Sequence, residues 1–165
     1  MRQAAMPSRL PTRLPSRAIA PYIWCMQLHA TCVARAGHGV LLVGPPGAGK
    51  SDLALRLLDR GFDLVADDRV DIIAGMASPP AALAGLLEAR GLGLLHLPHV
   101  LSARLALVVR LATAMERLPA PAKDASLGLP MLTLDPCSAS AAQRVGLALD
   151  CALGTVRQLA GAFAA

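Results

Sequence analysis

The chain has 165 residues, a length typical of a single globular domain. Apolar residues make up 55% of it and charged residues 16%, which argues against an intrinsically disordered polypeptide. Aromatic residues account for only 2%, which argues against the stacking platforms that commonly bind single-stranded nucleic acid. No apolar run reaches the roughly 20 residues that a membrane-spanning helix needs.

Residues 1–25 differ in composition from the rest of the chain. They contain four Arg, four Pro and no acidic residue, and the Pro spacing is incompatible with a long helix. We interpret them as a disordered N-terminal extension or as the product of a start codon placed too early, with Met26 as the alternative start. Residues 26–165 carry 12 basic and 11 acidic side chains, so the net charge of +5 does not indicate a nucleic-acid-binding domain.

Short apolar runs separated by turn residues fill the first half of the predicted domain. Residues 28–34 predict a strand, and the wholly apolar residues 40–43 predict a strand that is buried on both faces. The Leu spacing over residues 50–60 predicts an amphipathic helix that ends at Gly61. Two further strands are predicted over residues 62–66 and 69–73.

The second half of the chain has weaker patterns. Gly91 and Gly93 argue against one continuous helix over residues 86–98. A strand, a loop and another strand are predicted in turn over residues 105–112, 119–130 and 131–134. Two helices complete the predicted domain, and Ser138 or Ser140 is a candidate N-cap for the first of them. These helices are predicted over residues 139–150 and 151–163.

Residues 44–51, GPPGAGKS, match the phosphate-binding pattern GxxxxGK[ST] in full. A predicted strand precedes them and a predicted helix follows, which is the context in which this pattern binds nucleotides. Lys50 would contact the terminal phosphates and Ser51 would bind Mg²⁺. Pro45 and Pro46 lack an N–H group, so we expect the backbone donors to come from the rest of the loop. The predicted nucleotide-binding residues are Gly44, Pro45, Pro46, Gly47, Ala48, Gly49, Lys50 and Ser51.

Two adjacent carboxylates, Asp67 and Asp68, follow the strand predicted over residues 62–66. Ligands of open α/β sheets bind at the carboxyl ends of strands, so both carboxylates could lie near the phosphates. Neighbouring carboxylates repel each other, so one of them can hold a proton and serve as a base in one direction and an acid in the other. The alternative interpretation is a solvated turn in which an Asp caps the next element.

The four cysteines have no spacing typical of a metal site. They indicate reduced thiols, and hence a cytoplasmic location.

Together these features resemble the HPr kinase/phosphorylase family. The similar string begins at His29, runs through the phosphate-binding loop to VADDRVDI, and resumes at LLEARGLGLLHL. His29 lies 21 residues before Lys50, as a His does in that family, and residues 88–93 are similar to its signature EIRGLG. The resemblance covers residues 28–97, about half of the chain, and no counterpart of the family's N-terminal domain is seen. We therefore expect the short form of the family, with a kinase domain over residues 26–165.

The resemblance implies an α/β fold in which a P-loop domain contains a mixed β-sheet flanked by helices. It implies ATP- and Mg²⁺-dependent phosphorylation of a serine on the phosphocarrier protein HPr or a paralogue, and thereby regulation of the phosphotransferase system. The family also catalyses the reverse, phosphorylase reaction, but its KPGRN-like loop is not recognisable around residues 126–138, so the resemblance supports the kinase reaction more strongly than the reverse reaction. The hexamers of the family imply a homo-oligomer.

The resemblance also implies roles for individual residues. Asp68 is similar in position to the base that takes the serine proton, with His29 beside it and Asp67 as a supporting acid. Ser51 and Glu88 are similar to the Mg²⁺ ligands. Arg90, Gly91 and Gly93 belong to the segment that is similar to the family signature, which the resemblance links to both reactions.

Arg117 lies in the segment MERLP at residues 115–119, which is similar to a family segment that follows the next strand. The resemblance makes Arg117 a candidate for stabilising the charge of the transferring phosphoryl group. The alternative interpretation is a surface Arg after a strand. The implied catalytic residues are His29, Lys50, Asp68 and Arg117.

Two other classes of function are consistent with these residues. One is a P-loop kinase that acts on a small molecule, for which Arg104, Arg110 and Arg117 could serve as lid residues. The other is a non-catalytic regulator in which nucleotide binding alone changes the affinity for a partner. An Asp68→Asn substitution distinguishes them, because it should abolish catalysis and leave nucleotide binding intact.

Overall fold

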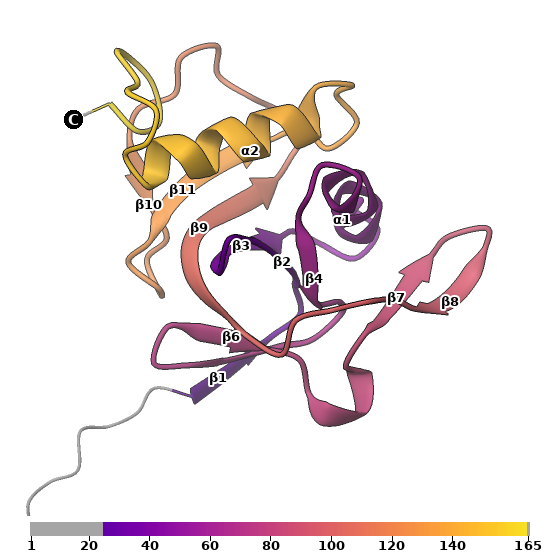
Figure 1. Cartoon of the computed structure of the whole chain (residues 1–165). Helices are drawn as coiled ribbons and strands as arrows, with labels where there is room; N and C mark the ends of the chain where they lie inside the picture. The colour runs from indigo at the N-terminus through magenta and orange to yellow at the C-terminus, as the bar shows by residue number, and fades with distance from the viewer. Residues whose placement is uncertain (1–24, 165) are drawn as a thin grey trace, which may run out of the picture.

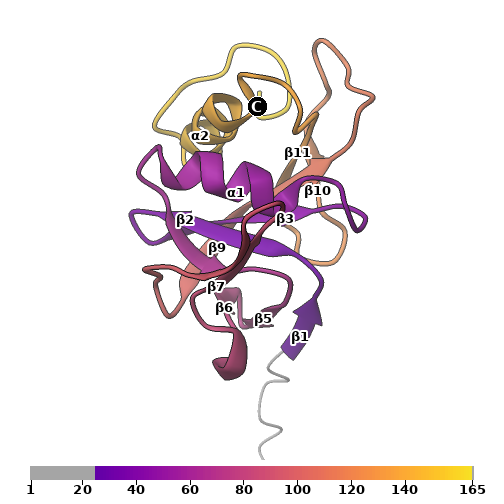
Figure 2. The same cartoon turned by 90° about the vertical axis from the view of Figure 1, so that its right-hand side faces the viewer.

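The computed structural model of the chain describes residues 25–164. The N-terminal extension predicted over residues 1–25 lies outside the described residues, except for Cys25. The described residues form a curved β-sheet with both α-helices on one of its faces (Figures 1 and 2). Among the helices described here, none combines the length and the apolarity that crossing a membrane requires.

Eleven strands, two α-helices and one 3₁₀ turn follow one another along the described part of the chain. In order they are β1 Cys25–Leu28, β2 Thr31–Arg35, β3 His38–Val43, α1 Lys50–Leu58, β4 Asp63–Ala66, β5 Val70–Ile73, β6 Met76–Ser78, the 3₁₀ turn Ala81–Leu83, β7 Leu86–Ala89, β8 Gly93–His96, β9 Ala103–Leu111, β10 Ala122–Lys123, β11 Pro130–Leu134 and α2 Ala141–Ala152.

The main sheet has the strand order β1-β5-β6-β9-β3-β2-β4, and β11 with β10 is added beside β9. The pairs β3–β9 and β9–β11 are parallel, whereas the other pairs are antiparallel. The long strand β9 pairs with β6 near its start and with β11 near its end, so it joins the two parts of the sheet. The expected mixed α/β fold is confirmed.

The core lies on both faces of the central strands. Val40 and Leu42 pack into the cluster that includes α1 and α2, whereas Leu41 packs into the cluster on the opposite face. All three side chains are fully buried, which confirms the prediction of a strand covered on both faces. Because the core contains few aromatic residues, it is built mainly from Leu, Val and Ala.

The prediction of one strand over residues 28–34 is wrong, because that segment divides into β1 and β2. β1 pairs with β5, whereas β2 pairs with β3 and β4, so the chain changes partners between Leu28 and Thr31. His29 and Ala30 form the bend, and this change of partner cannot be read from the local pattern of apolar residues.

The prediction of a last helix over residues 151–163 is also wrong. α2 ends at Ala152, and residues 153–164 form turns in which Gly154 and Gly161 have φ angles of 75° and 114°. Such angles are incompatible with a right-handed helix.

The N-cap of α2 is Ser140, one of the two predicted, although its side chain makes no capping hydrogen bond. Residues 86–96 form the hairpin β7–β8 and no helix, as the two glycines predicted.

Candidate active site

The segment between β3 and α1 has the geometry of a phosphate-binding loop. β3 ends at Val43, the loop spans residues 44–49, and α1 begins at Lys50. Gly47 and Gly49 have φ angles of 78° and 85°, which residues with a Cβ atom rarely adopt. The strand, loop and helix predicted around GPPGAGKS are therefore confirmed, and the loop lies at the N-terminus of a helix, where anions bind favourably.

The ammonium group of Lys50 is held inside this loop. Its Nζ atom donates to the carbonyl oxygens of Gly44 at 3.0 Å and of Pro45 at 3.2 Å, and lies 3.5 Å from Nε2 of His29. Only 7% of the residue is exposed. The positive charge is thus fixed where the phosphates of a bound nucleotide would lie.

Asp67 is a buried junction between three segments. Its Oδ1 atom accepts hydrogen bonds from the hydroxyl of Thr31 at 2.6 Å and from the hydroxyl of Ser51 at 3.0 Å, and its Oδ2 atom accepts one from the backbone N–H of Glu88 at 3.3 Å. Only 6% of Asp67 is exposed. The end of β4 is therefore connected to β2, to α1 and to β7 through one carboxylate.

Asp68 differs from Asp67 both in burial and in its partners. Its side chain is 64% exposed, and its φ angle of 67° turns the chain sharply between β4 and β5. Its carboxylate lies 3.0 Å from Nδ1 of His29, and the same nitrogen lies 2.9 Å from its carbonyl oxygen. Because Nδ1 faces two acceptors, it carries the ring hydrogen, and Nε2 is left to accept from Lys50.

A cavity of about 540 Å³ brings these groups together. It is lined by His29, Lys50 and Ser51 and by both aspartates, together with Glu88 and Arg90 of the β7–β8 hairpin. The predicted proximity of the aspartates to the phosphate-binding loop is confirmed. Gly91 lies in the turn of the hairpin and Gly93 is the first residue of β8; the hairpin projects from the main sheet (Figure 1), and neither glycine lines the cavity.

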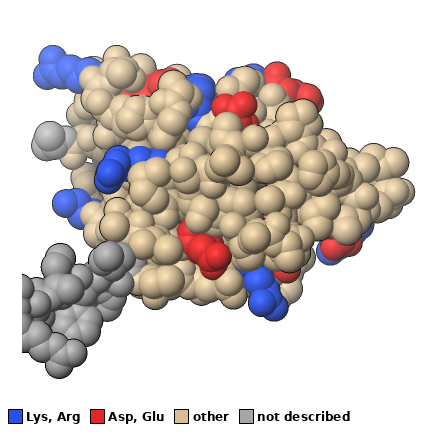
Figure 3. Space-filling view, turned by 60° about the horizontal axis from the view of Figure 1, so that its bottom comes forward, with Lys and Arg blue, Asp and Glu red and all other residues tan. Residues whose placement is uncertain are grey.

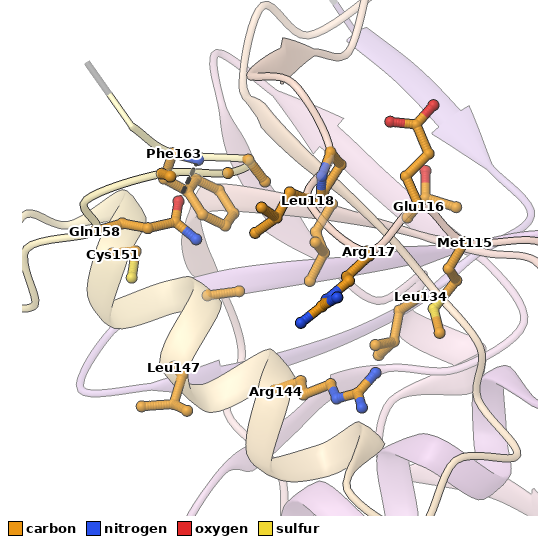
Figure 4. Close-up of a pocket in the computed structure, with 17 residues that line it drawn as sticks. Met115, Glu116, Arg117, Leu118, Leu134, Arg144, Leu147, Cys151, Gln158 and Phe163 are labelled. Carbon is orange, nitrogen blue, oxygen red and sulfur yellow. Dashed lines mark hydrogen bonds between the residues drawn. The ribbon is translucent and has the colours of Figure 1, made fainter.

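Arg117 lies in a different cavity. That cavity also has a volume of about 540 Å³ and lies between the segment after β9 and helix α2. Figure 4 shows Arg117 and Arg144 in it, with the apolar side chains of Leu118 and Leu134 nearby. Arg117 is not among the residues that line the cavity at the phosphate-binding loop, and neither are Arg104 and Arg110.

The oxygen donors at the phosphate-binding loop fit a magnesium ion. Ser51 donates its hydrogen to Asp67, so the lone pairs of its hydroxyl are available to a cation. Glu88 adds a carboxylate to the same cavity. Over the described residues, no group of three or more His, Cys, Asp or Glu is placed to hold a metal. The hydroxyl of Ser51 and the carboxylate of Glu88 suit Mg²⁺, which is usually bound by one or two protein ligands together with substrate phosphates.

Thr31 does not line this cavity but contacts Asp67, and the sequence analysis did not identify it. It is fully buried, and it is a polar residue at the start of a strand whose next three residues, Cys32, Val33 and Ala34, are apolar and buried. A polar residue in an apolar segment was the signal that could have identified Thr31. Its partner, Asp67, could not be identified in this way, because the contact depends on the pairing of β2 with β4.

The charged side chains on the face shown in Figure 3 are few and scattered. On that face, Lys and Arg do not gather into a continuous basic patch of the kind that binds nucleic acid.

The fold and the site define a mixed α/β protein that carries a phosphate-binding loop between a buried strand and a helix. The sequence model of the HPr Serine kinase C-terminal domain matches residues 22–116, and the chain belongs to this family.

Curated relatives are named HPr kinase/phosphorylase. That of Burkholderia lata is 34% identical over 166 residues, which cover 88% of this chain and 50% of the relative. That of Lacticaseibacillus casei strain BL23 is 41% identical over 108 residues, which cover 58% of this chain and 33% of the relative. The chain thus spans half or less of the length of these two relatives.

A solved structure described as the Hpr(Ser) kinase/phosphatase from Coxiella burnetii superposes with a TM-score of 0.67. The match covers 79% of this chain and 92% of that chain at 24% sequence identity. It confirms the fold.

Proposed function

We propose that the chain is a cytoplasmic serine protein kinase that transfers the terminal phosphoryl group of ATP to the phosphocarrier protein HPr or a paralogue, and thereby regulates the phosphotransferase system. The observation that carries this proposal is the cavity in which Lys50 and Ser51 lie beside Asp67, Asp68 and His29. Membership of the HPr Serine kinase C-terminal domain family supports the choice of substrate.

The phosphates of ATP are held by the loop in this proposal. The backbone N–H groups from Gly47 to Ser51 and the ammonium of Lys50 bind the phosphate oxygens. Ser51 and Glu88 hold Mg²⁺, and Asp67 orients Ser51 through the hydrogen bond at 3.0 Å. The bound Mg²⁺ neutralises charge on the terminal phosphates.

Asp68 is the base in this proposal. Both oxygens of Asp67 already accept hydrogen bonds from fixed donors, whereas the carboxylate of Asp68 is exposed in the cavity and pairs with Nδ1 of His29 at 3.0 Å. Asp68 takes the proton of the incoming serine hydroxyl, whose oxygen bonds to the terminal phosphorus while the bond to the leaving ADP breaks. His29 holds the carboxylate in place and separates it from Lys50.

The test is phosphorylation of HPr from the same genome by the full chain with Mg²⁺ and ATP, followed by mass spectrometry of the serine. We expect one added phosphate with the wild-type chain and none with Asp68→Asn, which should still bind ATP. Asp63→Asn is the matched control, because Asp63 is an exposed residue of β4 outside the cavity.

Each other outcome has a defined meaning. If Asp68→Asn still phosphorylates HPr, Asp68 is not the base; loss of transfer in Asp67→Asn does not by itself assign that role to Asp67, because Asp67 also orients Ser51. If the wild-type chain binds ATP and leaves HPr unmodified, the proposed substrate is wrong, and a small-molecule kinase or a nucleotide-dependent regulator takes its place.

A further inference from the structure

Thr31 has a fully buried hydroxyl group in a strand whose next three residues are also buried. A hydroxyl removed from water needs a hydrogen-bond partner, and here the partner is Oδ1 of Asp67 at 2.6 Å. The sheet brings the two together, because the neighbouring residues Cys32 and Ala66 are paired between β2 and β4. The contact is therefore built into the register of the sheet.

The same oxygen of Asp67 accepts the hydrogen of Ser51 at 3.0 Å. A hydroxyl has one hydrogen and two lone pairs, and it binds a cation through a lone pair. While its hydrogen points at Asp67, Ser51 therefore keeps both lone pairs free for a cation. The position of Oδ1 thus decides which way the hydroxyl of Ser51 faces.

Two donors outside the phosphate-binding loop fix the carboxylate of Asp67. Thr31 holds Oδ1, and the backbone N–H of Glu88 holds Oδ2 at 3.3 Å. The contact with Thr31 is shorter by 0.7 Å, and its donor belongs to a fully buried residue, whereas the N–H donor at Glu88 belongs to a residue with an exposed side chain. Thr31 is therefore the firmer of the two supports.

We propose that Thr31 is a positioning residue for the divalent-cation site: it holds Asp67 so that Ser51 presents its lone pairs to Mg²⁺. Thr31 does not line the cavity and acts through Asp67 alone. This inference rests on the proposed function, since it assumes that a metal–nucleotide complex binds at the phosphate-binding loop. It concerns the metal and is independent of which molecule receives the phosphoryl group.

The experiment measures the affinity of the full chain for a fluorescent ATP analogue with and without Mg²⁺. Thr31→Val keeps the shape of the side chain and removes the hydroxyl, whereas Thr31→Ser keeps the hydroxyl and removes the methyl group. Thr133→Val is the matched control, because Thr133 is a strand residue outside this cavity. Circular dichroism and thermal unfolding show that each variant is folded.

We expect Mg²⁺ to raise the nucleotide affinity of Thr31→Val by a factor about tenfold smaller than in the wild-type chain. The reason is that the substitution removes one hydrogen bond to a charged group. Its metal-free affinity should be unchanged, and Thr31→Ser and Thr133→Val should behave like the wild-type chain. A purely structural role would instead lower both affinities together, and would make Thr31→Ser as defective as Thr31→Val.

The inference is overturned if Thr31→Val retains the full effect of Mg²⁺, or if both affinities fall equally. It is also overturned if the wild-type chain shows no effect of Mg²⁺ on nucleotide binding. Failure of the proposed function has a different signature: Mg²⁺-dependent binding that responds to Thr31 as expected, together with an HPr that remains unphosphorylated.

Discussion

His29 Nε2 lies 3.5 Å from Lys50 Nζ, although the two residues are 21 positions apart in the sequence. The chain between them is β2, the turn to β3, β3 itself and the phosphate-binding loop. Because β2 and β3 form an antiparallel hairpin, the chain leaves His29 and returns to the same end of the sheet. The spacing of 21 residues is thus the length of one hairpin plus one loop.

Lys50→Met tests whether the buried ammonium binds phosphate. The substitution keeps the aliphatic stem and removes the charge from the loop, where Nζ lies 3.0 Å from the carbonyl oxygen of Gly44. We expect the affinity for ATP to fall about tenfold or more, the loss typical of a hydrogen bond to a charged group. Isothermal titration calorimetry measures it, with Lys123→Met on the exposed strand β10 as the control. Equal affinities in both variants would contradict the assignment.

Arg117→Ala tests the role implied for this residue by the family resemblance. Arg117 lines a cavity other than that at the phosphate-binding loop, so we expect its removal to leave the affinity for ATP unchanged. The rate of phosphate transfer is measured in parallel. A lower kcat at unchanged affinity is the result that a role in stabilising the phosphoryl group requires, whereas an unchanged kcat would remove Arg117 from the catalytic residues.

Gly85→Ala tests the packing at the base of the β7–β8 hairpin. Gly85 has a φ angle of 74°, and a Cβ atom there would lie 2.6 Å from Nδ1 of His99. We expect the free energy of unfolding to fall by about 2–3 kcal/mol, from backbone strain and steric overlap together.

Gly37→Ala is the control for this substitution. Gly37 has a φ angle of 79° and open space around the added atom, so only the backbone strain of about 1–2 kcal/mol remains. Urea denaturation measures both variants, and an equal loss in the two would show that His99 does not restrict Gly85.

Cys32 makes the stability of the protein depend on pH in the alkaline range. Burial raises the pKa of the Cys32 thiol from 9.0 to about 12. Between these two values the unfolded chain loses the thiol proton while the folded chain keeps it. The free energy of unfolding should therefore fall as pH rises, by about 1.4 kcal/mol per pH unit from this group.

Urea denaturation at several pH values above 9 measures this slope. Cys32→Ala should show a shallower dependence than the wild-type chain, whereas Cys137→Ala, which alters an exposed thiol, should show the same dependence. Identical slopes in all three proteins would mean that Cys32 ionises as readily in the folded state as in the unfolded state.

Much of the site could be predicted because its main parts are local in the sequence. The strand, loop and helix around Lys50 follow from an apolar run, a glycine-rich turn and a helical Leu spacing within about 20 residues. Asp67 and Asp68 could be placed at a strand end for the same reason. Their different surroundings could not, because both residues lie in the bend after β4, where the φ angle of 67° at Asp68 turns the chain, and the sequence does not say which carboxylate such a turn leaves buried.

The sequence by itself determined the phosphate-binding loop, the mixed α/β class and the family, since each depends on residue types at fixed spacing. Only the tertiary structure decided that β1 and β2 are separate strands, that residues 153–164 form turns, and that Arg117 lies in a second cavity. The contact between Thr31 and Asp67 was likewise decided only by the tertiary structure. All of these depend on which strands pair and in what register, and such pairing is fixed by packing between segments far apart in the chain.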